Sequence, residues 1–168
     1  MERKPEYQIR EMREWEYSQL QDFLYEAIFQ PDASSPLSRT VLGQPELRVY
    51  FEDFGLKEDD LCLCAESGGK IRGAVWIRRI CGYGYVGDAV PELAIALYKE
   101  YRGFGIGTEL MKRMLELLQR KGYRKVSLSV QKGNFALKMY CRLGFQPIRE
   151  TPEEYVMEYD FEKKGVVI

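Results

Sequence analysis

Apolar residues recur along the chain at two spacings, every second position in some stretches and every third or fourth in others. The first spacing is typical of strands with one buried face, and the second of amphipathic helices. The predicted strands are residues 7–12, 61–66, 71–80, 92–97, 126–130, 145–149 and 155–161. The predicted helices are residues 14–29, 46–54, 106–121 and 134–143. The order of these elements predicts a mixed α/β fold.

The best-marked element is the predicted helix at 106–121. Ile106, Leu110 and Met114 recur on one face at helical spacing, and Gly122 suits a left-handed helix stop. The stretch SGGK stands between the predicted strands before and after it, and its glycines favour a reversing turn. We therefore expect an antiparallel hairpin there.

Length and charge limit the class of protein. A chain of 168 residues suits one domain better than two, so we expect a single domain over 1–168. Lys and Arg total 25 against 26 Asp and Glu, which leaves no basic field for nucleic acid or an anionic membrane. No apolar run reaches the length of a signal core or a membrane span. We expect a cytoplasmic protein with no nucleic-acid or membrane partner.

The chain contains no histidine. This excludes Ser-His-Asp and Cys-His nucleophile systems and His-ligated metals, and we expect no metal. The cysteines Cys62, Cys64, Cys81 and Cys141 form no CxxC pair, so we expect reduced thiols that serve packing. Any chemistry therefore falls to carboxylate, phenol, thiol, amine or backbone groups.

Three glycines precede the predicted helix at 106–121, in the stretch YRGFGIGTEL. Gly103, Gly105 and Gly107 follow a predicted strand, and a helix N-terminus with free N–H groups binds anions well. A dinucleotide fingerprint would need glycine where Thr108 stands, and the lysine of a P-loop is absent. The stretch predicts a phosphate-binding turn with Arg102 at its mouth, or simply a tight strand-to-helix turn.

A second motif favours the first of these two interpretations. The stretch SVQKGNFALKMYCRLGF places an asparagine at a helix start, a tyrosine within the helix and Leu-Gly-Phe at its end. Together with the glycine loop it resembles the GNAT superfamily of acetyl-CoA-dependent N-acetyltransferases, over residues 60–161 and more weakly before them. The matching residues are Arg102, Gly105, Gly107, Asn134, Ala136, Tyr140, Leu143, Gly144 and Phe145.

The resemblance implies a fold and a cofactor site. The fold is an α/β (α+β) arrangement with a mixed, mostly antiparallel central sheet of six to seven strands, flanked by about four helices and with a splayed central strand pair. The co-substrate is acetyl-CoA (coenzyme A), whose pantetheine arm lies on the strand 92–97 and whose pyrophosphate lies on the glycine loop. The implied binding residues are Ile95, Ala96, Leu97, Arg102, Gly103, Phe104, Gly105, Ile106, Gly107, Thr108 and Asn134.

Tyr140 matches the tyrosine that protonates the departing thiolate in this family. A phenol keeps its proton at neutral pH, with a reference pKa of about 10, and can still pass it to a thiolate. The alternative is an ordinary core aromatic residue. We expect the acid role, because the glycine loop accompanies the tyrosine.

The general base is less sharply marked. An amine acceptor is mostly protonated at pH 7, so a carboxylate should take a proton directly or through water. Glu92 at the start of the splayed strand is the first candidate and Asp88 the second, and Glu92 is otherwise a surface charge on an edge strand. An acyl-cysteine route through Cys141 lacks a group that lowers the thiol pKa, and a packed position is expected for Cys141 instead.

The resemblance implies that the acceptor is an amine of a small molecule or a peptide. In the family, the region of the first two helices and the loop before the central strand shape its pocket, which here means residues 29–54 and 81–88. Candidate contacts are Phe51, Asp53, Trp76, Tyr83, Tyr85 and Asp88. The residues do not rank the acceptors.

The leading hypothesis is acetyl transfer by direct attack in a ternary complex. The alternatives are a catalytically silent acyl-CoA-binding module and, third, a protein that binds ATP or NAD through the glycine loop. The apolar residues 166–168 favour a homodimer, as is frequent in the family.

Overall fold

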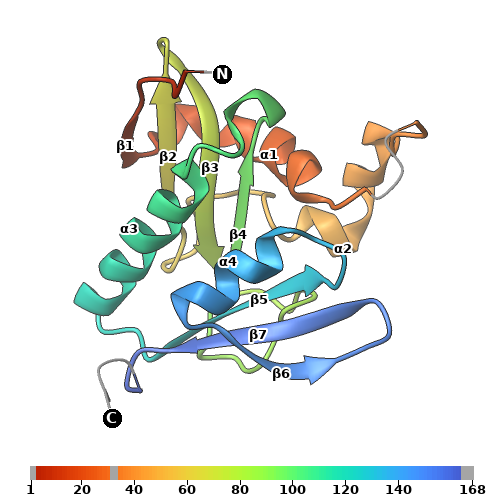
Figure 1. Cartoon of the computed structure of the whole chain (residues 1–168). Coiled ribbons are helices and arrows are strands. Elements are labelled where there is room, and N and C mark those ends of the chain that lie inside the picture. The colour runs from red at the N-terminus through yellow and green to blue at the C-terminus, as the bar shows by residue number, and fades with distance from the viewer. Residues whose placement is uncertain (1–2, 31–33, 164–168) are drawn as a thin grey trace.

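The computed structural model describes residues 3–30 and 34–163. Within them the strands form one seven-stranded sheet in the order β1-β2-β3-β4-β5-β7-β6 (Figure 1). Neighbouring strands are antiparallel except β4 and β5, which are parallel. The strands are β1 (Gln8–Glu11), β2 (Leu61–Ser67), β3 (Lys70–Arg78), β4 (Glu92–Leu97), β5 (Lys125–Gln131), β6 (Gln146–Glu150) and β7 (Glu154–Asp160). The fold class and the hairpin expected from the sequence are confirmed.

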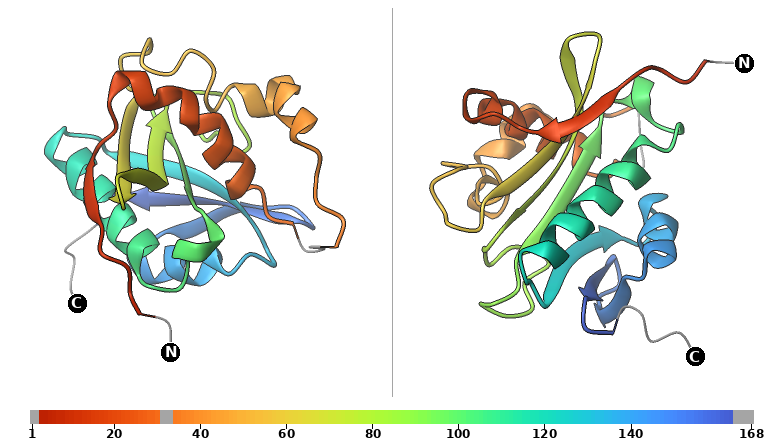
Figure 2. Two further views of the ribbon diagram at one scale, coloured as in Figure 1. Left: turned by 90° about the horizontal axis from the view of Figure 1, so that it is seen from above. Right: turned by 90° about the vertical axis from the view of Figure 1, so that its left-hand side faces the viewer.

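The helices of the described residues lie on both faces of this sheet. Figure 2 shows α1 on one face and α3 with α4 on the other. The α-helices are α1 (Leu20–Ala27), α2 (Pro45–Arg48), α3 (Ile106–Arg120) and α4 (Ala136–Leu143). Short 3₁₀ helices are η1 (Glu14–Gln19), η2 (Arg39–Gly43) and η3 (Lys99–Tyr101).

Two predicted helices differ from the observed ones. The predicted helix at 14–29 begins as η1, becomes α-helical only at Leu20 and ends at Ala27. The predicted helix at 46–54 stops at Arg48, and turns replace it up to residue 54. Asp53 and Gly55 have φ values of 54° and 103°, a left-handed backbone that no α-helix can continue through.

Each face of the sheet carries its own apolar core. On one face the buried side of α3, including Leu110 and Met114, packs against sheet residues such as Val75. On the other face Phe23 of α1 packs in a cluster with Trp76. Each such fully buried side chain contributes roughly 1.5–3 kcal/mol of transfer free energy, so the sheet is held from both sides.

β4 and β5 separate at the centre of the sheet. β4 pairs with β3 over its whole length, from Glu92 to Leu97, whereas its register with β5 holds only the pair Glu92↔Ser127. From that pair the two strands diverge toward the end of β4 (Figure 1). The splayed strand pair predicted from the sequence is therefore present, and it opens toward the glycine loop.

Several sequence expectations concern the surface. No helix in the described ranges is long and apolar enough to cross a membrane.

Cys62 and Cys64 are buried, but Cys81 and Cys141 are exposed, so packing was the wrong expectation for the last two. Cys141 faces away from the sheet because its neighbour Tyr140 faces toward it, and successive helical side chains are about 100° apart. The apolar residues 166–168 lie outside the described residues, and the homodimer stays a prediction.

Candidate active site

The glycine loop joins η3 to α3 and uses its glycines for two different reasons. Gly103 and Gly105 have φ values of 84° and 85°, and a Cβ added at either would meet no atom within 4 Å. Their backbone conformation requires glycine, and open space remains above it. At Gly107 a Cβ would lie 3.3 Å from Leu97 Cδ1 and 3.9 Å from Met139 Sδ. Glycine there lets α3 approach both β4 and α4.

The loop leaves a row of backbone amides without acceptors. The N–H groups of residues 103–108 make no hydrogen bond within the described part of the chain, and the first helical bond is Glu109 N to Gly105 O at 3.1 Å. Such groups carry the positive end of the helix dipole outward. Free amides above open space fit a pyrophosphate, which accepts several hydrogen bonds and carries negative charge.

Arg102 braces this loop. Its Nε donates to Leu97 O at 2.9 Å, and its Nη2 lies 3.3 Å from Glu26 O and 3.4 Å from Glu26 Oε2. The guanidinium therefore ties the loop to the end of β4 and to α1. Because Glu26 offsets part of its charge, Arg102 acts here mainly by fixing the loop.

The register of β4 decides which of its backbone groups face the gap. Tyr98 N donates to Arg72 O on β3, and Ser127 N of β5 donates to Pro91 O. Since backbone groups alternate in direction along a strand, those of Ile95 and Leu97 point toward the gap and those of Ala96 toward β3. Of the three residues predicted to bind the pantetheine arm, Ile95 and Leu97 present backbone groups to the gap, and the contact itself stays a prediction.

Tyr140 lies on α4 with a buried ring and an uncommitted hydroxyl. The residue is 7% exposed, and its ring centroid lies 5.8 Å from that of Phe145. Its hydroxyl has no hydrogen-bond partner among the described residues. Burial raises the pKa of Tyr140 above its ordinary value, so the phenol stays protonated.

Asn134 caps α4. Its Oδ1 accepts from Ala136 N at 2.9 Å, which satisfies one of the free amides at the start of the helix. The cap explains the asparagine on structural grounds, and its predicted contact with the cofactor stays a prediction.

Glu92 is buried at the start of β4, with 3% of its surface exposed. Its carboxylate accepts from Gly82 N at 2.7 Å, from the Tyr50 hydroxyl at 2.8 Å and from Gly84 N at 3.1 Å. Burial raises the pKa of Glu92, although these hydrogen bonds act in the opposite direction. The alternative of a surface charge on an edge strand is wrong, because β4 is a central strand and the residue faces the protein interior.

Tyr50 was not among the candidates, since nothing in the sequence around it marks it as more than a core aromatic residue. It lies 42 positions before Glu92, and only the folded chain brings the two together.

The sequence model of the family described as "Acetyltransferase (GNAT) family" matches residues 8–145 of this chain. The chain belongs to this family. The resemblance seen in the glycine loop and the Tyr140 helix is confirmed, and with it the enzyme class, an acetyltransferase of the GNAT type.

Individual GNAT proteins are similar to this chain at different levels. A Bacillus subtilis protein named as a putative ribosomal protein bS18-alanine N-acetyltransferase is 37% identical over 86 residues, covering 51% of this chain and 53% of that protein. The match thus spans about half the length of that relative.

Solved GNAT structures share the fold. The PaiA N-acetyltransferase of Thermoplasma acidophilum, solved in complex with coenzyme A, has a TM-score of 0.68 at 18% identity, over 93% of this chain and 99% of that one. The ribosomal-protein-S18-alanine N-acetyltransferase of Escherichia coli has a TM-score of 0.63 at 16% identity, over 97% and 99%.

The end of the first segment expected to shape the acceptor pocket and part of the second line one cavity. It has a volume of about 570 Å³, with residues 49–57 on one side and residues 78–90 on the other. Asp53, Tyr85 and Asp88 line it, and the Tyr85 hydroxyl donates to the Asp88 carboxylate. The carboxylates and the aromatic ring are groups that bind amines, and the cations Lys57, Arg78 and Arg79 line the same cavity.

The other candidate acceptor contacts do not line this cavity. Tyr83 is 46% exposed outside it, and Phe51 packs against the core. Trp76 is 1% exposed and donates to Tyr50 O at 2.9 Å, so the expectation of an acceptor contact is wrong for Trp76. The side chain fills the core between α1 and the sheet.

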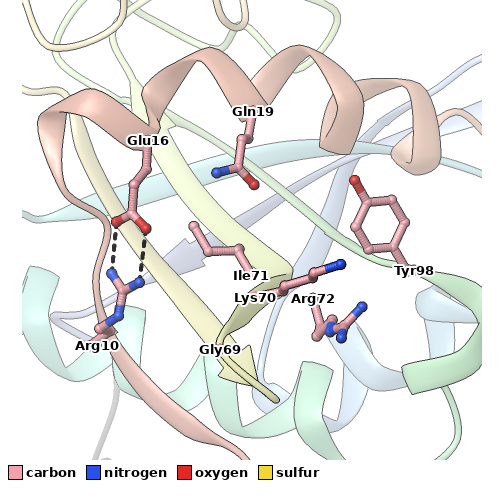
Figure 3. Close-up of a pocket in the computed structure, with 8 residues that line it drawn as sticks. All are labelled: Arg10, Glu16, Gln19, Gly69, Lys70, Ile71, Arg72 and Tyr98. Carbon is pink, nitrogen blue, oxygen red and sulfur yellow. Dashed lines mark hydrogen bonds and ion pairs between the residues drawn. The ribbon is translucent and has the colours of Figure 1, made fainter.

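A second cavity, of about 300 Å³, lies beside η1 and the start of β3. Figure 3 shows the Arg10–Glu16 ion pair on one side of it and Lys70, Arg72 and Tyr98 on the other. It contains none of the residues predicted for the site. The described residues also include no group of three or more Cys, Asp or Glu side chains placed to hold a metal ion.

Proposed function

We propose that this protein moves an acetyl group from acetyl-CoA to a primary amine by direct attack in a ternary complex. The observation that carries the proposal is the row of unpaired amides at residues 103–108, at the end of β4 where the gap toward β5 is open. The first N–H groups of any helix lack internal partners, and here the amides of residues 103–105, which precede α3, extend that row.

The residues of this chain fit the proposed cofactor. The amides of residues 103–108 would bind the pyrophosphate, the backbone groups of Ile95 and Leu97 the pantetheine arm, and Asn134 would face the cofactor. Bound acetyl-CoA would supply the thioester that reacts with the amine. Arg102 would hold the loop in its binding conformation through Leu97 O and Glu26.

Tyr140 is the proposed general acid. Its hydroxyl has no competing partner in the described residues, and its raised pKa keeps the proton in place until the C–S bond breaks and the sulfur takes it. The nitrogen of the amine forms the new bond to the acetyl carbon, and the free thiol leaves.

Glu92 is the proposed base, acting through a water molecule. Burial strengthens its carboxylate as a base, but Tyr50, Gly82 and Gly84 already donate to it, which restricts direct contact with an amine. Asp88 in the cavity between residues 49–57 and 78–90 is the second candidate.

The names of the relatives favour one acceptor class. Two of them are named as alanine N-acetyltransferases of a ribosomal protein, so the N-terminal amine of an alanine peptide is the first acceptor to test. Small amines form the second arm of the panel. A cytoplasmic location and a single domain over 1–168 stay predictions.

The test combines binding with turnover. Calorimetric titration with acetyl-CoA, with ATP and NADH as controls, should give selective binding of acetyl-CoA. The panel of amines is then assayed for release of free thiol. Selective binding without transfer to any amine would favour the catalytically silent acyl-CoA-binding module, and binding of ATP or NADH instead would favour the nucleotide-binding alternative.

A further inference from the structure

Residues 81–91 form the loop between β3 and β4, and three of its consecutive amides are bound by two side chains. Gly82 N donates to Glu92 Oε1 at 2.7 Å, Tyr83 N to the Tyr50 hydroxyl at 2.8 Å, and Gly84 N to Glu92 Oε2 at 3.1 Å. The Tyr50 hydroxyl in turn donates to Glu92 Oε2 at 2.8 Å. The N–H groups of residues 82–84 are thus bound by a Tyr–Glu pair and not by a neighbouring strand.

These contacts explain the glycine and aromatic pattern CGYGYVG, which the acetyl-transfer chemistry does not use. A Cβ at Gly82 would lie 2.5 Å from the Tyr50 hydroxyl and 2.8 Å from Glu92 Oε2, and one at Gly84 would lie 2.8 Å from Leu128 C. Side chains at these two positions would push the loop away from the pair and from β5.

The pair joins the two sides of the 570 Å³ cavity. Tyr50 belongs to the segment 49–57 on one side and accepts from Tyr83 N of the segment 78–90 on the other, although neither Tyr50 nor Glu92 itself lines the cavity. Beyond the pair, the Ser127 hydroxyl donates to Gly84 O at 2.7 Å and Arg149 Nη2 to Tyr85 O at 3.1 Å. Hydrogen bonds from Ser127 and Arg149 therefore hold the carbonyl groups of residues 84 and 85. The Tyr50–Glu92 bond determines how closely residues 82–84 approach segment 49–57.

The same pair stands at the junction of the two proposed binding regions. Glu92 is the residue of β4 that pairs with Ser127, so the cofactor gap begins where the carboxylate holds the loop. A shift of the loop at this point changes where an amine in the cavity lies relative to the gap between the strands.

We propose that Tyr50 and Glu92 act together as positioning residues that fix residues 82–84 against segment 49–57 and thereby set the shape of the amine-binding cavity. This inference rests on the proposed function only in taking an amine as the molecule that binds in the cavity. The position of the loop can be measured without any acceptor.

The first experiment compares Tyr50→Phe with Tyr17→Phe. The Tyr17 hydroxyl has no hydrogen bond within the described residues, and its ring packs edge-on to Phe54 in the same region, so this variant removes a hydroxyl without the contact. Loss of a hydrogen bond to a charged group should raise amide exchange in residues 81–91 about tenfold or more in Tyr50→Phe. Tyr17→Phe should match the parent protein.

The kinetic readout uses the best amine of the panel. For Tyr50→Phe we expect KM for the amine to rise about tenfold, kcat to change less than about threefold, and the Kd of acetyl-CoA to stay within about twofold. Unchanged exchange in residues 81–91 overturns the proposal, and so does a fall in kcat at constant KM, which would place Tyr50 in proton transfer.

A second variant keeps the proposal testable if Tyr50→Phe does not fold. Glu92→Gln keeps the size of the side chain but replaces one acceptor oxygen by a donor, so exchange at residues 82–84 should again rise. In the double variant the effects on exchange should be no larger than the larger single effect, because the two side chains are hydrogen-bonded to each other and bind adjacent amides of the same loop. Additive effects would show that the residues act separately and would also overturn the proposal. If no amine is acetylated by the parent protein, the proposed function fails while the exchange experiments still decide this inference.

Discussion

Glu92 and Ser127 are the residues at which β4 and β5 pair, and beyond them the strands diverge. Ser127 is fully buried and Glu92 nearly so, which fixes the start of the gap within the core. The other end of the gap lies at the glycine loop, where the Arg102 side chain donates a hydrogen bond to Leu97 O. The candidate site thus lies between two rigid points of the sheet.

Replacement of Tyr140 by phenylalanine removes the proposed acid and keeps the ring. Loss of a general acid should lower kcat about 10²-fold or more while the Kd of acetyl-CoA stays nearly unchanged. Tyr159→Phe is the matched control, because Tyr159 is 6% exposed and its hydroxyl also lacks a hydrogen bond in the described residues. Steady-state turnover with the best amine decides the question. Equal turnover in both variants would remove Tyr140 from the mechanism.

Gly105→Glu should abolish acetyl-CoA binding. Its carboxylate would occupy the open space above the free amides and repel a pyrophosphate. Gly122→Glu is the control, since Gly122 has a φ of 84° and open space above it but lies at the other end of α3. Both variants carry a similar backbone strain, of about 1 kcal/mol or more, so their melting temperatures should fall alike. Calorimetry that finds equal Kd values for the two would contradict the pyrophosphate site.

The ion pair of Arg78 and Asp60 should contribute strongly to the free energy of unfolding. The side chains are 3% and 0% exposed, and Arg78 also donates to Val49 O and Glu52 O at 3.0 and 2.7 Å. Asp60→Ala leaves a buried charge without its partner, which should lower the free energy of unfolding by about 3–5 kcal/mol. Denaturant unfolding measures this change.

The control for that experiment is Asp22→Ala, which breaks the exposed pair with Arg39. An exposed pair is worth about 1 kcal/mol or less. A loss of similar size in both variants would mean that the Arg78 side chain does not support segment 49–60.

The Arg10–Glu16 pair predicts a pH dependence of stability. Hydrogen bonds from Arg10 lower the pKa of Glu16 from 4.5 to about 2. Because the folded-state pKa is the lower one, the pair stabilises the fold above pH 4.5, and this stability is lost as the pH falls toward 2. Urea unfolding of the parent protein and of Glu16→Gln should therefore differ at pH 6 and converge as the pH approaches 2. A difference that stays constant over this range would show that ionisation of Glu16 does not contribute to the stability of the fold.

Local signals predicted correctly the strand and the helix that carry the proposed cofactor site. The strand over residues 92–97 matches β4, and the helix at 106–121 differs from α3 by one residue at its C-terminal end. These elements could be predicted because the strand spacing, the positive-φ glycines and the amphipathic face each lie within about one turn of the positions that they determine. The family expectation drawn from the same residues is confirmed by the family match.

The acceptor side was harder to predict because its geometry comes from distant contacts. The segment 46–54 has a helical pattern, but turns replace the helix after Arg48, where Trp76 and Arg78 of β3 bind its carbonyls. Hydrogen bonds to partners more than 25 positions away outweigh a weak helical propensity.

By itself, then, the sequence determined the elements, the glycine loop with its helix, the position of Tyr140 on α4 and the absence of histidine chemistry. The tertiary structure decided which side chains of β4 are buried, that Ala96 faces β3, and that Glu92 receives hydrogen bonds from Tyr50 and the loop. The physical reason is that backbone conformation and amphipathic spacing are local properties, whereas burial and hydrogen-bond partners depend on which segments the sheet brings side by side.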